Sequence, residues 1–216
     1  MSAVSGRRVL LAGGTSEAGW AAARRLREAG AHAIVAGRSA DKLAAFADEG
    51  FDTFAMDLTD EAAVDRLATD LREIDGVLHL VGGWRGGGGI PGQTDADWAV
   101  LESSLTAWRH VSRALWPQLI ASPAARLAVV SSTAVARPLA GGANYAAVKA
   151  AAEAWTRALA HGFAKHSRDA QAEQTGAATI FRVTQLAGLE DRLATEFAAL
   201  WDRPATEVND AVIDLR

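Results

Sequence analysis

The sequence predicts a three-layer α/β fold in which helices cover both faces of a doubly wound parallel sheet. Two observations carry this prediction. Short apolar β-type runs alternate with alanine-rich segments of helical period, and each run is apolar along its whole length. Strands buried on both faces have this continuous apolar character, and a parallel sheet between two helical layers buries its strands in this way.

The length of the chain fits a single domain. It has 216 residues, of which 50% are hydrophobic. That is enough for one well-buried core and leaves little length for two full domains. We therefore expect one domain over residues 1–216, with no internal repeat and no linker.

The expected elements follow one another in a regular order. The strands are the runs 9–12, 33–36, 51–56, 77–81, 127–130 and 178–183. The helices lie near residues 17–29, 40–49, 60–73, 95–120, 143–166 and 189–201. Gly30 and Gly50 stand where helix C-caps would precede the next strand. Pro117 falls late in the fourth helix and should bend or end it, because proline lacks the N–H that a helix interior needs.

Charge and composition argue against several classes of protein. The net charge is -4 and the isoelectric point is near 5.7, so we expect no nucleic-acid partner. The absence of cysteine excludes disulfides and thiolate metal sites and fits a reducing cytosol. His161 and His166 lie off a common helix face, and we expect no metal site. No stretch has the apolar length of a membrane span or a signal-peptide core, so we expect a cytoplasmic protein.

A glycine-rich turn, Gly13–Gly19, follows the first expected strand and opens the first helix. Glycines here allow a sharp turn and a close approach to a pyrophosphate, which then rests on the N-terminal amides of the helix. Thr15 and Ser16 are placed as hydroxyl donors, whereas the Glu17 carboxylate would repel a pyrophosphate unless its side chain points to solvent. The pattern indicates a dinucleotide site; a tight turn without a ligand is the alternative.

The residues after the second and third strands bear on the choice of dinucleotide. Arg38 stands where such folds read the adenosine ribose, and an arginine there would attract a 2′-phosphate. This favours NADP(H) over NAD(H), with a solvated surface arginine as the alternative. Asp57 and Leu58 could contact the adenine edge, or Asp57 could N-cap the next helix.

The one tyrosine of the chain, Tyr145, lies four residues before Lys149, one of only three lysines. In a helix, this spacing stacks the phenol and the ammonium on one face, where the cation favours the phenolate and makes Tyr145 a usable acid at neutral pH. Ser132 lies thirteen residues before the tyrosine. The pattern indicates a proton donor for a hydride transfer. The alternatives are that Ser132 caps a strand end and that Tyr145 is an ordinary buried aromatic.

With these motifs in order, the chain resembles the short-chain dehydrogenase/reductase family over nearly its whole length. The resemblance rests on the segments Gly13–Gly19, Asp57–Thr59, Asp75–Gly82, Ser131–Ser132 and Asn144–Ala150. Residues 129–155 look most like the ketoacyl-reductase branch. The resemblance implies a Rossmann fold and an NAD(P)(H)-dependent interconversion of a carbonyl and a secondary alcohol.

The resemblance also implies a role for each candidate residue. Tyr145 would give or take a proton at the substrate oxygen, Ser132 would hydrogen-bond that oxygen, and Lys149 would support the phenolate and hold the nicotinamide ribose. The expected cofactor-binding residues are Gly13, Thr15, Ser16, Ala18, Gly19, Arg38, Asp57, Leu58, Gly82 and Lys149. The partners implied are a small-molecule carbonyl or alcohol substrate and further copies of the chain, in a homodimer or homotetramer packed through the fourth and fifth helices.

Several positions depart from the family pattern. Glu17 replaces a glycine of the first turn, and the family's Asn-Asn-Ala-Gly is His79–Gly82 here. The asparagine that supports a water-mediated proton relay to the lysine becomes Ser104, a shorter side chain and our candidate relay residue. The family's Pro-Gly after the sixth strand is Thr184–Gln185, which leaves little room for a substrate lid. The chain reaches Arg216 after a segment like the family's last helix, and we expect the usual seventh strand to be absent.

A glycine run, Gly82–Gly89, directly follows the fourth strand, where the ligand crevices of such sheets open. It carries Trp84, which could stack on substrate or nicotinamide if the loop folds over the crevice in place of a lid. A disordered tip or a subunit contact is the alternative.

The sequence leaves three functional hypotheses. An oxidoreductase that prefers NADP(H) is favoured by Ser132, Tyr145 and Lys149 in register. A nucleotide-binding sensor or interaction protein with weak or no catalysis is favoured by Glu17, Ser104 and the missing lid. A scaffold without a nucleotide site is the third.

Overall fold

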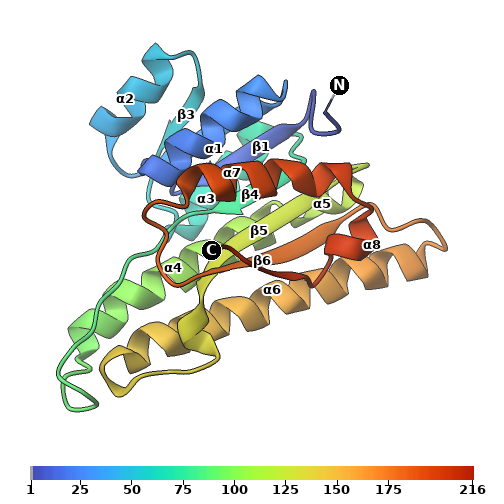
Figure 1. Ribbon diagram of the computed structural model, residues 1–216. Coiled ribbons are helices and arrows are strands. Elements are labelled where there is room, and N and C mark those ends of the chain that lie inside the picture. Colours follow the sequence, from blue (N-terminus) through green and yellow to red (C-terminus); the bar gives the residue numbers. More distant parts are fainter. Residues whose placement is uncertain (1) are drawn as a thin grey trace.

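In the computed structural model, which describes residues 2–216, seven strands form one sheet in the order β3-β2-β1-β4-β5-β6-β7 (Figure 1). The strands are β1 (Arg8–Ala12), β2 (His32–Gly37), β3 (Asp52–Ala55), β4 (Gly76–His79), β5 (Arg126–Ser132), β6 (Ala177–Val183) and β7 (Val212–Asp214). Every neighbouring pair is parallel. The chain winds outward from β1 to β3 and then returns to build outward from β4. A crevice therefore opens beyond the carboxyl ends of β1 and β4, where the order reverses.

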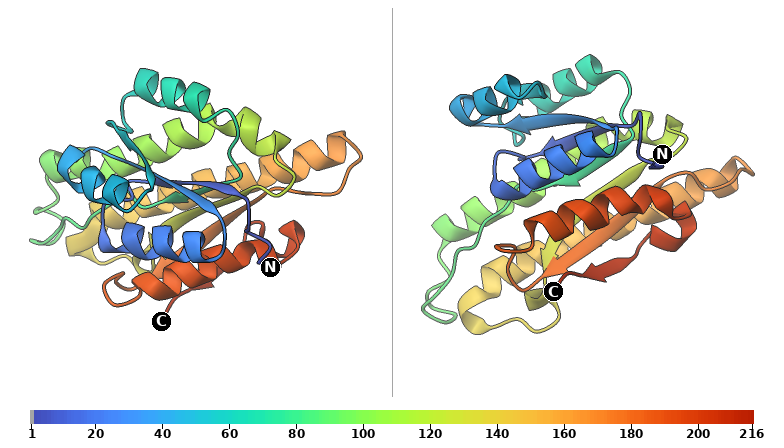
Figure 2. Two further views of the ribbon diagram at one scale, coloured as in Figure 1. Left: turned by 90° about the horizontal axis from the view of Figure 1, so that it is seen from above. Right: turned by 45° about the horizontal axis from the view of Figure 1, so that its top comes forward.

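Helices cover both faces of this sheet, as the left view of Figure 2 shows. On one face lie α1 (Glu17–Glu28), α2 (Ala40–Asp48) and α7 (Glu190–Ala198). On the other lie α3 (Glu61–Leu71), α4 (Asp95–Ala114), α5 (Trp116–Ala121) and α6 (Ala143–Asp169). Shorter helices are η1 (Thr133–Val135), η2 (Ala140–Gly142), η3 (Ala199–Asp202) and α8 (Ala205–Val208). Alternate strand residues enter different cores: Val9 belongs to the first and Leu10 to the second. None of the helices in this part of the chain is long and apolar enough to cross a membrane.

Local sequence signals set the ends of the helices. Ser16 begins α1 as an N-cap whose side chain accepts from the Gly19 amide at 3.3 Å. Gly30 and Gly50 follow the ends of α1 and α2 with φ of +84°, so their prediction as C-cap glycines is confirmed. The predicted break at Pro117 is confirmed as well, because α4 ends at Ala114 and a separate helix begins at Trp116 with proline in its first turn.

The expectation that the sheet lacks a seventh strand is wrong. β7 pairs in parallel with β6, with Val212 beside Ile180 and Asp214 beside Arg182. Its flanking residue Leu215 is buried in the core and donates its amide to the Arg182 carbonyl at 2.8 Å. The strand has only three residues and pairs on one side, so it is only partly buried and does not produce the long apolar run that marks the inner strands.

Candidate active site

Two adjoining cavities open beyond the carboxyl ends of the strands. The larger has a volume of about 790 Å³ and the smaller about 360 Å³. Both are lined by Ser16 and by Leu80, Val81 and Gly82, the residues that follow β4. The two cavities therefore share a wall at the crevice between β1 and β4. Together they are suited to one elongated ligand with two distinct ends.

The three candidate catalytic residues line the larger cavity. Ser132 ends β5, and Tyr145 and Lys149 lie one turn apart on α6. The Lys149 ammonium nitrogen is 5.8 Å from the centroid of the Tyr145 ring and donates a hydrogen bond to the Val130 carbonyl at 2.8 Å. Burial lowers the pKa of Lys149 to about 8. A lysine in this range can exchange a proton near neutral pH.

The Ser132 hydroxyl caps a short helix and can still donate a hydrogen bond into the larger cavity. Its hydroxyl oxygen accepts from the Ala134 amide at 3.1 Å and so caps the short helix η1. The cap uses the oxygen as an acceptor and leaves the hydroxyl proton free to be donated into the cavity. Within residues 2–216, no direct hydrogen bond joins Ser132, Tyr145 and Lys149. All three side chains line the larger cavity.

A buried ion pair that the sequence analysis missed fastens this arrangement. Glu153, one helical turn beyond Lys149, accepts from the Ser131 hydroxyl at 2.7 Å and from the Arg182 guanidinium at 2.8 and 2.6 Å. Burial alone would raise the pKa of Glu153, but the hydrogen bonds from Arg182 and Ser131 outweigh it and hold that pKa below its usual value. The carboxylate thus ties α6 to both β5 and β6. Its position four residues after Lys149 places it on the same face of α6, which was the one signal in the sequence. Its partners Ser131 and Arg182 are distant in sequence, so the ion pair could not be predicted.

Close contacts within the protein require glycine at two positions of the first turn. Gly13 has a φ of +77°, and a Cβ there would lie 2.6 Å from Val81. A Cβ at Gly19 would overlap the Gly14 carbonyl. Thr15 lines the smaller cavity at this turn, whereas Ala18 is buried and lines neither cavity. These contacts make the turn tight, and it leads directly into the N-terminus of α1, where unpaired backbone amides favour an anion.

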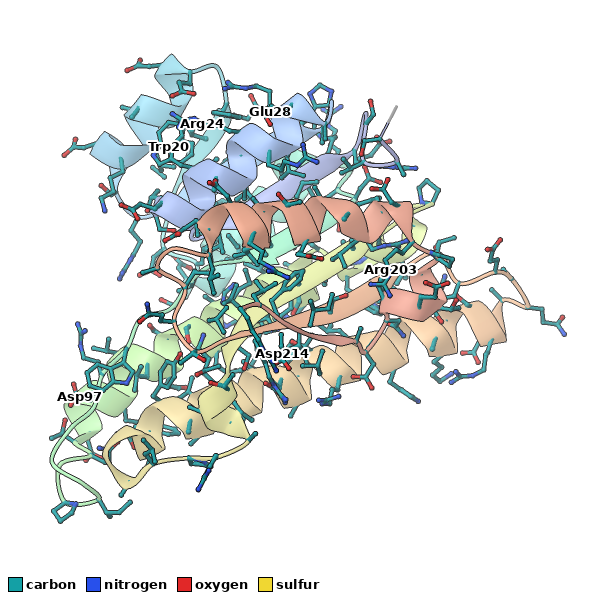
Figure 3. The ribbon with its side chains drawn as sticks, in the orientation of Figure 1. Trp20, Arg24, Glu28, Asp97, Arg203 and Asp214 are labelled. Carbon is teal, nitrogen blue, oxygen red and sulfur yellow. The ribbon has the colours of Figure 1, made fainter. Side chains whose placement is uncertain are left out.

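Glu17 points away from both cavities. Its side chain is exposed and lines a shallow groove between α1 and α7. Trp20, Arg24 and Glu28 of the same helix, labelled in Figure 3, line this groove as well. The carboxylate therefore lies on the outer side of the helix, and the repulsion expected at a pyrophosphate is reduced by its exposure to water.

The smaller cavity brings together the residues expected to read the adenosine end. Arg38 and Lys42 line it, together with Asp57 and Leu58. Asp57 accepts from both the amide and the hydroxyl of Thr59, at 2.9 and 2.8 Å, which holds its pKa below the ordinary value. The next helix is capped by Asp60 instead, so the alternative role of Asp57 as an N-cap is wrong.

Lys42 is the cationic lining residue that the sequence analysis missed. It lies in the first turn of α2, four residues after Arg38. Arg38 precedes the N-cap Ser39, so the two residues do not share a helix face, and the turn between β2 and α2 brings both to the cavity. Both side chains are exposed at the rim of the cavity, where they can meet a phosphate group.

The candidate relay residue does not face the larger cavity. The Ser104 hydroxyl donates to the Leu101 carbonyl at 2.7 Å, within its own helix. The Ser104 carbonyl in turn accepts from His79 Nε2 at 3.0 Å. His79 lines the larger cavity and is only 3% exposed, and its Nδ1 atom has no partner among the described residues. Burial, and then the charge of Lys149, lower the pKa of His79 to about 3.

We expect His79 to make the folded protein sensitive to acid. The unfolded chain takes up a proton at this histidine near pH 6.5, whereas the folded protein stays neutral there until about pH 3. Below about pH 6 the neutral imidazole should therefore cost about 1.4 kcal/mol of unfolding free energy for each pH unit. Urea unfolding between pH 7 and pH 4.5 should show a shallower loss of stability for His79→Asn than for the wild-type protein.

The exposed His32 supplies the control for this prediction. The His32→Asn variant should lose stability in parallel with the wild-type protein as the pH falls. Parallel curves for His79→Asn and wild type would instead mean that His79 takes up its proton at the same pH in the folded and the unfolded protein.

The loop after β6 is short, and no cluster of metal ligands accompanies the site. Only residues 184–189 separate β6 from α7, and Thr184, Gln185 and Leu186 from this loop line the larger cavity. In the described part of the chain, no group of three or more His, Asp or Glu side chains is arranged to hold a metal ion. Besides the three candidate catalytic residues, the polar side chains that line the larger cavity are Ser16, His79, Ser131, Thr184 and Gln185.

Comparison with known proteins identifies relatives of this chain. Residues 7–179 match the family model described as short chain dehydrogenase. A serine 3-dehydrogenase from Agrobacterium fabrum is 32% identical over 150 residues, which cover 66% of this chain and 60% of the relative. A galactitol 2-dehydrogenase from Rhizobium johnstonii is 32% identical over 176 residues, covering 76% of this chain and 68% of the relative. The match thus spans about three fifths of the first of these proteins.

Solved structures share the fold at lower sequence identity. A gluconate 5-dehydrogenase from Burkholderia cenocepacia, in complex with NADP and tartrate, superposes with a TM-score of 0.80 at 22% identity, covering 98% of this chain and 94% of that one. A metagenomic short-chain oxidoreductase in complex with NADP has a TM-score of 0.83 at 23% identity, covering 100% and 99%. These likenesses show the fold of the chain.

Proposed function

Because the chain belongs to the short-chain dehydrogenase/reductase family, we propose that it is an oxidoreductase that interconverts a carbonyl compound and a secondary alcohol with a nicotinamide dinucleotide. The observation that carries this proposal is the joining of two cavities. Ser132, Tyr145 and Lys149 line one, and the cationic residues Arg38 and Lys42 line the other. A dinucleotide has one end suited to each cavity.

The proposed chemistry at the larger cavity is proton transfer to the substrate oxygen. The dinucleotide, when bound, supplies or accepts the hydride. In the direction of reduction, the Tyr145 hydroxyl donates its proton to the carbonyl oxygen as negative charge develops there. The Ser132 hydroxyl donates a hydrogen bond to the same oxygen, and the Lys149 ammonium beside the ring stabilises the phenolate that remains.

A reductase assay tests this proposal. NADPH consumption by the purified protein should depend on added ketone, and chromatography should show the corresponding alcohol formed in equal amount. A panel of aliphatic, cyclic and aromatic ketones samples the substrate class. Alcohol formation with any of them supports the proposal, and saturable NADPH binding without turnover on the whole panel counts against it.

A second candidate function is a nucleotide-binding sensor or interaction protein with little catalysis. It is favoured by the direction of the Ser104 hydroxyl, which donates within its own helix instead of facing Lys149. The same assay separates the two candidates, because the sensor binds NADPH and the oxidoreductase also consumes it.

We further propose that the protein prefers NADP(H) over NAD(H). Arg38 and Lys42 carry positive charge at the rim of the smaller cavity, where a 2′-phosphate would accept charge-assisted hydrogen bonds. Such bonds contribute about 1.5–3 kcal/mol each. The Arg38→Ala variant should therefore bind NADPH about 10- to 100-fold more weakly by calorimetry, with NADH affinity changed less than about threefold.

The exposed Lys165 on α6 offers a control, since it lies on neither cavity and pairs with Asp169. The Lys165→Ala variant should bind both dinucleotides as the wild-type protein does. Equal weakening of NADPH and NADH by Arg38→Ala would contradict the 2′-phosphate role. The homodimeric or homotetrameric assembly and the cytoplasmic location remain predictions from the sequence.

A further inference from the structure

The glycine run after β4 forms a loop that is hydrogen-bonded to the loop before α6. The Gly87 amide donates to the Gly141 carbonyl at 2.7 Å. The Gln93 side-chain amide nitrogen lies 3.1 Å from each of three carbonyls, those of Gly87, Gly89 and Gly141, and its oxygen accepts from the Asn144 amide at 3.0 Å. Figure 1 shows both loops projecting beyond the carboxyl ends of the strands. Gln93 thus joins the two loops at the start of α6, where it contacts Asn144.

The shape of this loop depends on its glycines. Gly87, Gly88 and Gly89 have φ of +124°, +65° and +65°, in the region that L side chains rarely adopt. A Cβ at Gly86 would overlap the Gly141 carbonyl, and a Cβ at Gly92 would lie 2.5 Å from the Gly87 carbonyl. The low-complexity sequence therefore specifies one tight conformation that packs against residues 139–142.

The loop after β4 and the loop before α6, which hydrogen bonds hold together, present apolar side chains to the larger cavity. Trp84 and Leu139 both line it, although they are 61% and 74% exposed, and Leu186 lines it from the loop after β6. Large apolar side chains that are exposed to water at a cavity mouth gain free energy when an apolar ligand covers them. An indole also offers a flat face on which an aromatic ring can stack.

The larger cavity offers little to a charged substrate. Among the described residues that line it, the only charged side chain is Lys149, which the proposed function assigns to the phenolate of Tyr145. A carboxylate on the substrate would have to compete for that ammonium, and a substrate ammonium would find no carboxylate. A neutral substrate avoids this desolvation cost.

We propose that the substrates are uncharged carbonyl compounds, or the corresponding alcohols, that carry an aromatic or other flat apolar group held against Trp84. This inference rests on the proposed oxidoreductase function and names its substrate class. It distinguishes the protein from a relative named for serine, which carries both a carboxylate and an ammonium at neutral pH.

Three ketones test the proposal as a matched set. Methyl benzoylformate is neutral and aromatic, benzoylformate carries a carboxylate in place of the methyl ester, and methyl pyruvate has a methyl group in place of the ring. The wild-type protein should reduce methyl benzoylformate with a kcat/KM at least about tenfold above that of either other ketone. Similar values for the ester and the acid, or for the aromatic and the small ester, would overturn the proposal.

Two tryptophan variants test whether Trp84 causes the preference for an aromatic substrate. Trp84→Ala should lower the ratio of kcat/KM for methyl benzoylformate to that for methyl pyruvate by about tenfold, because the stacking face is lost. Trp98→Ala should leave this ratio unchanged, since Trp98 is half exposed on α4 and does not line the cavity. An unchanged ratio in Trp84→Ala would overturn the role of this side chain.

A binding measurement separates this proposal from the proposed function. Calorimetry with NADPH present should show methyl mandelate binding more tightly than mandelate, and the Trp84→Ala variant should lose most of that difference. If this pattern is found without ketone reduction, the oxidoreductase function fails and the ligand class stands. If ketones are reduced but ester and acid bind equally, the ligand class fails and the oxidoreductase function stands.

Discussion

Replacing Tyr145 with phenylalanine should lower the turnover number for ketone reduction by about a thousandfold and leave NADPH affinity within about threefold of the wild-type value. The substitution removes only the hydroxyl that is proposed to protonate the substrate oxygen, and a positioned general acid contributes about 10²- to 10⁴-fold. The ring stays beside the Lys149 ammonium, so the shape of the cavity should be preserved. Steady-state kinetics and calorimetry measure the two effects.

The pairing of the two measurements excludes a general loss of structure. A variant that binds NADPH normally but fails to turn over has lost a chemical group. Tyr145 is the one tyrosine of the chain, so no other phenol can take over its role. Equal turnover by the variant and the wild-type protein would refute Tyr145 as the proton donor.

The second large effect concerns stability. The Glu153→Gln variant should lower the free energy of unfolding by about 3 kcal/mol, because it leaves the Arg182 guanidinium without its buried counter-charge. Glu153 is 4% exposed and receives hydrogen bonds from two strands, so water cannot replace what the carboxylate supplies. Urea unfolding gives this difference, and the melting temperature should fall by roughly 6–12 °C for a chain of this length.

An exposed ion pair provides the matched control. Glu61 pairs with Arg113 at 2.5 Å, and both side chains are more than half exposed. Glu61→Gln should therefore change stability by at most about 1 kcal/mol. The double variant Glu153→Leu with Arg182→Leu should recover much of the loss, because it removes both charges together. Equal effects of Glu153→Gln and Glu61→Gln would contradict the buried role of Glu153.

Most of the layered fold could be predicted because its signals are local. Buried parallel strands produce apolar runs, and caps such as Ser16 and Gly30 mark helix ends within a few residues. Tyr145 and Lys149 could be paired for the same reason, since one helical turn joins them. The strand β7 was not predicted because three half-buried residues at the edge of the sheet do not form the apolar run that marks a buried strand.

The supporting residues of the site could not be found in this way because their contacts cross long stretches of sequence. Glu153 meets Ser131 and Arg182 only once α6 lies against β5 and β6. Gln93 meets Gly141 only once two loops have folded against each other. The hydrogen bond between His79 and the Ser104 carbonyl, and the burial of His79, likewise become visible only in three dimensions.

The central claim is that the two cavities hold one dinucleotide whose nicotinamide end meets Tyr145, and a crystal structure of the NADPH complex tests it most directly. The account predicts the nicotinamide in the larger cavity beside Tyr145 and Lys149, the 2′-phosphate beside Arg38 and Lys42, and the Glu17 side chain turned away from the pyrophosphate. A well-ordered NADPH whose nicotinamide lies outside that cavity, away from Tyr145, would contradict it.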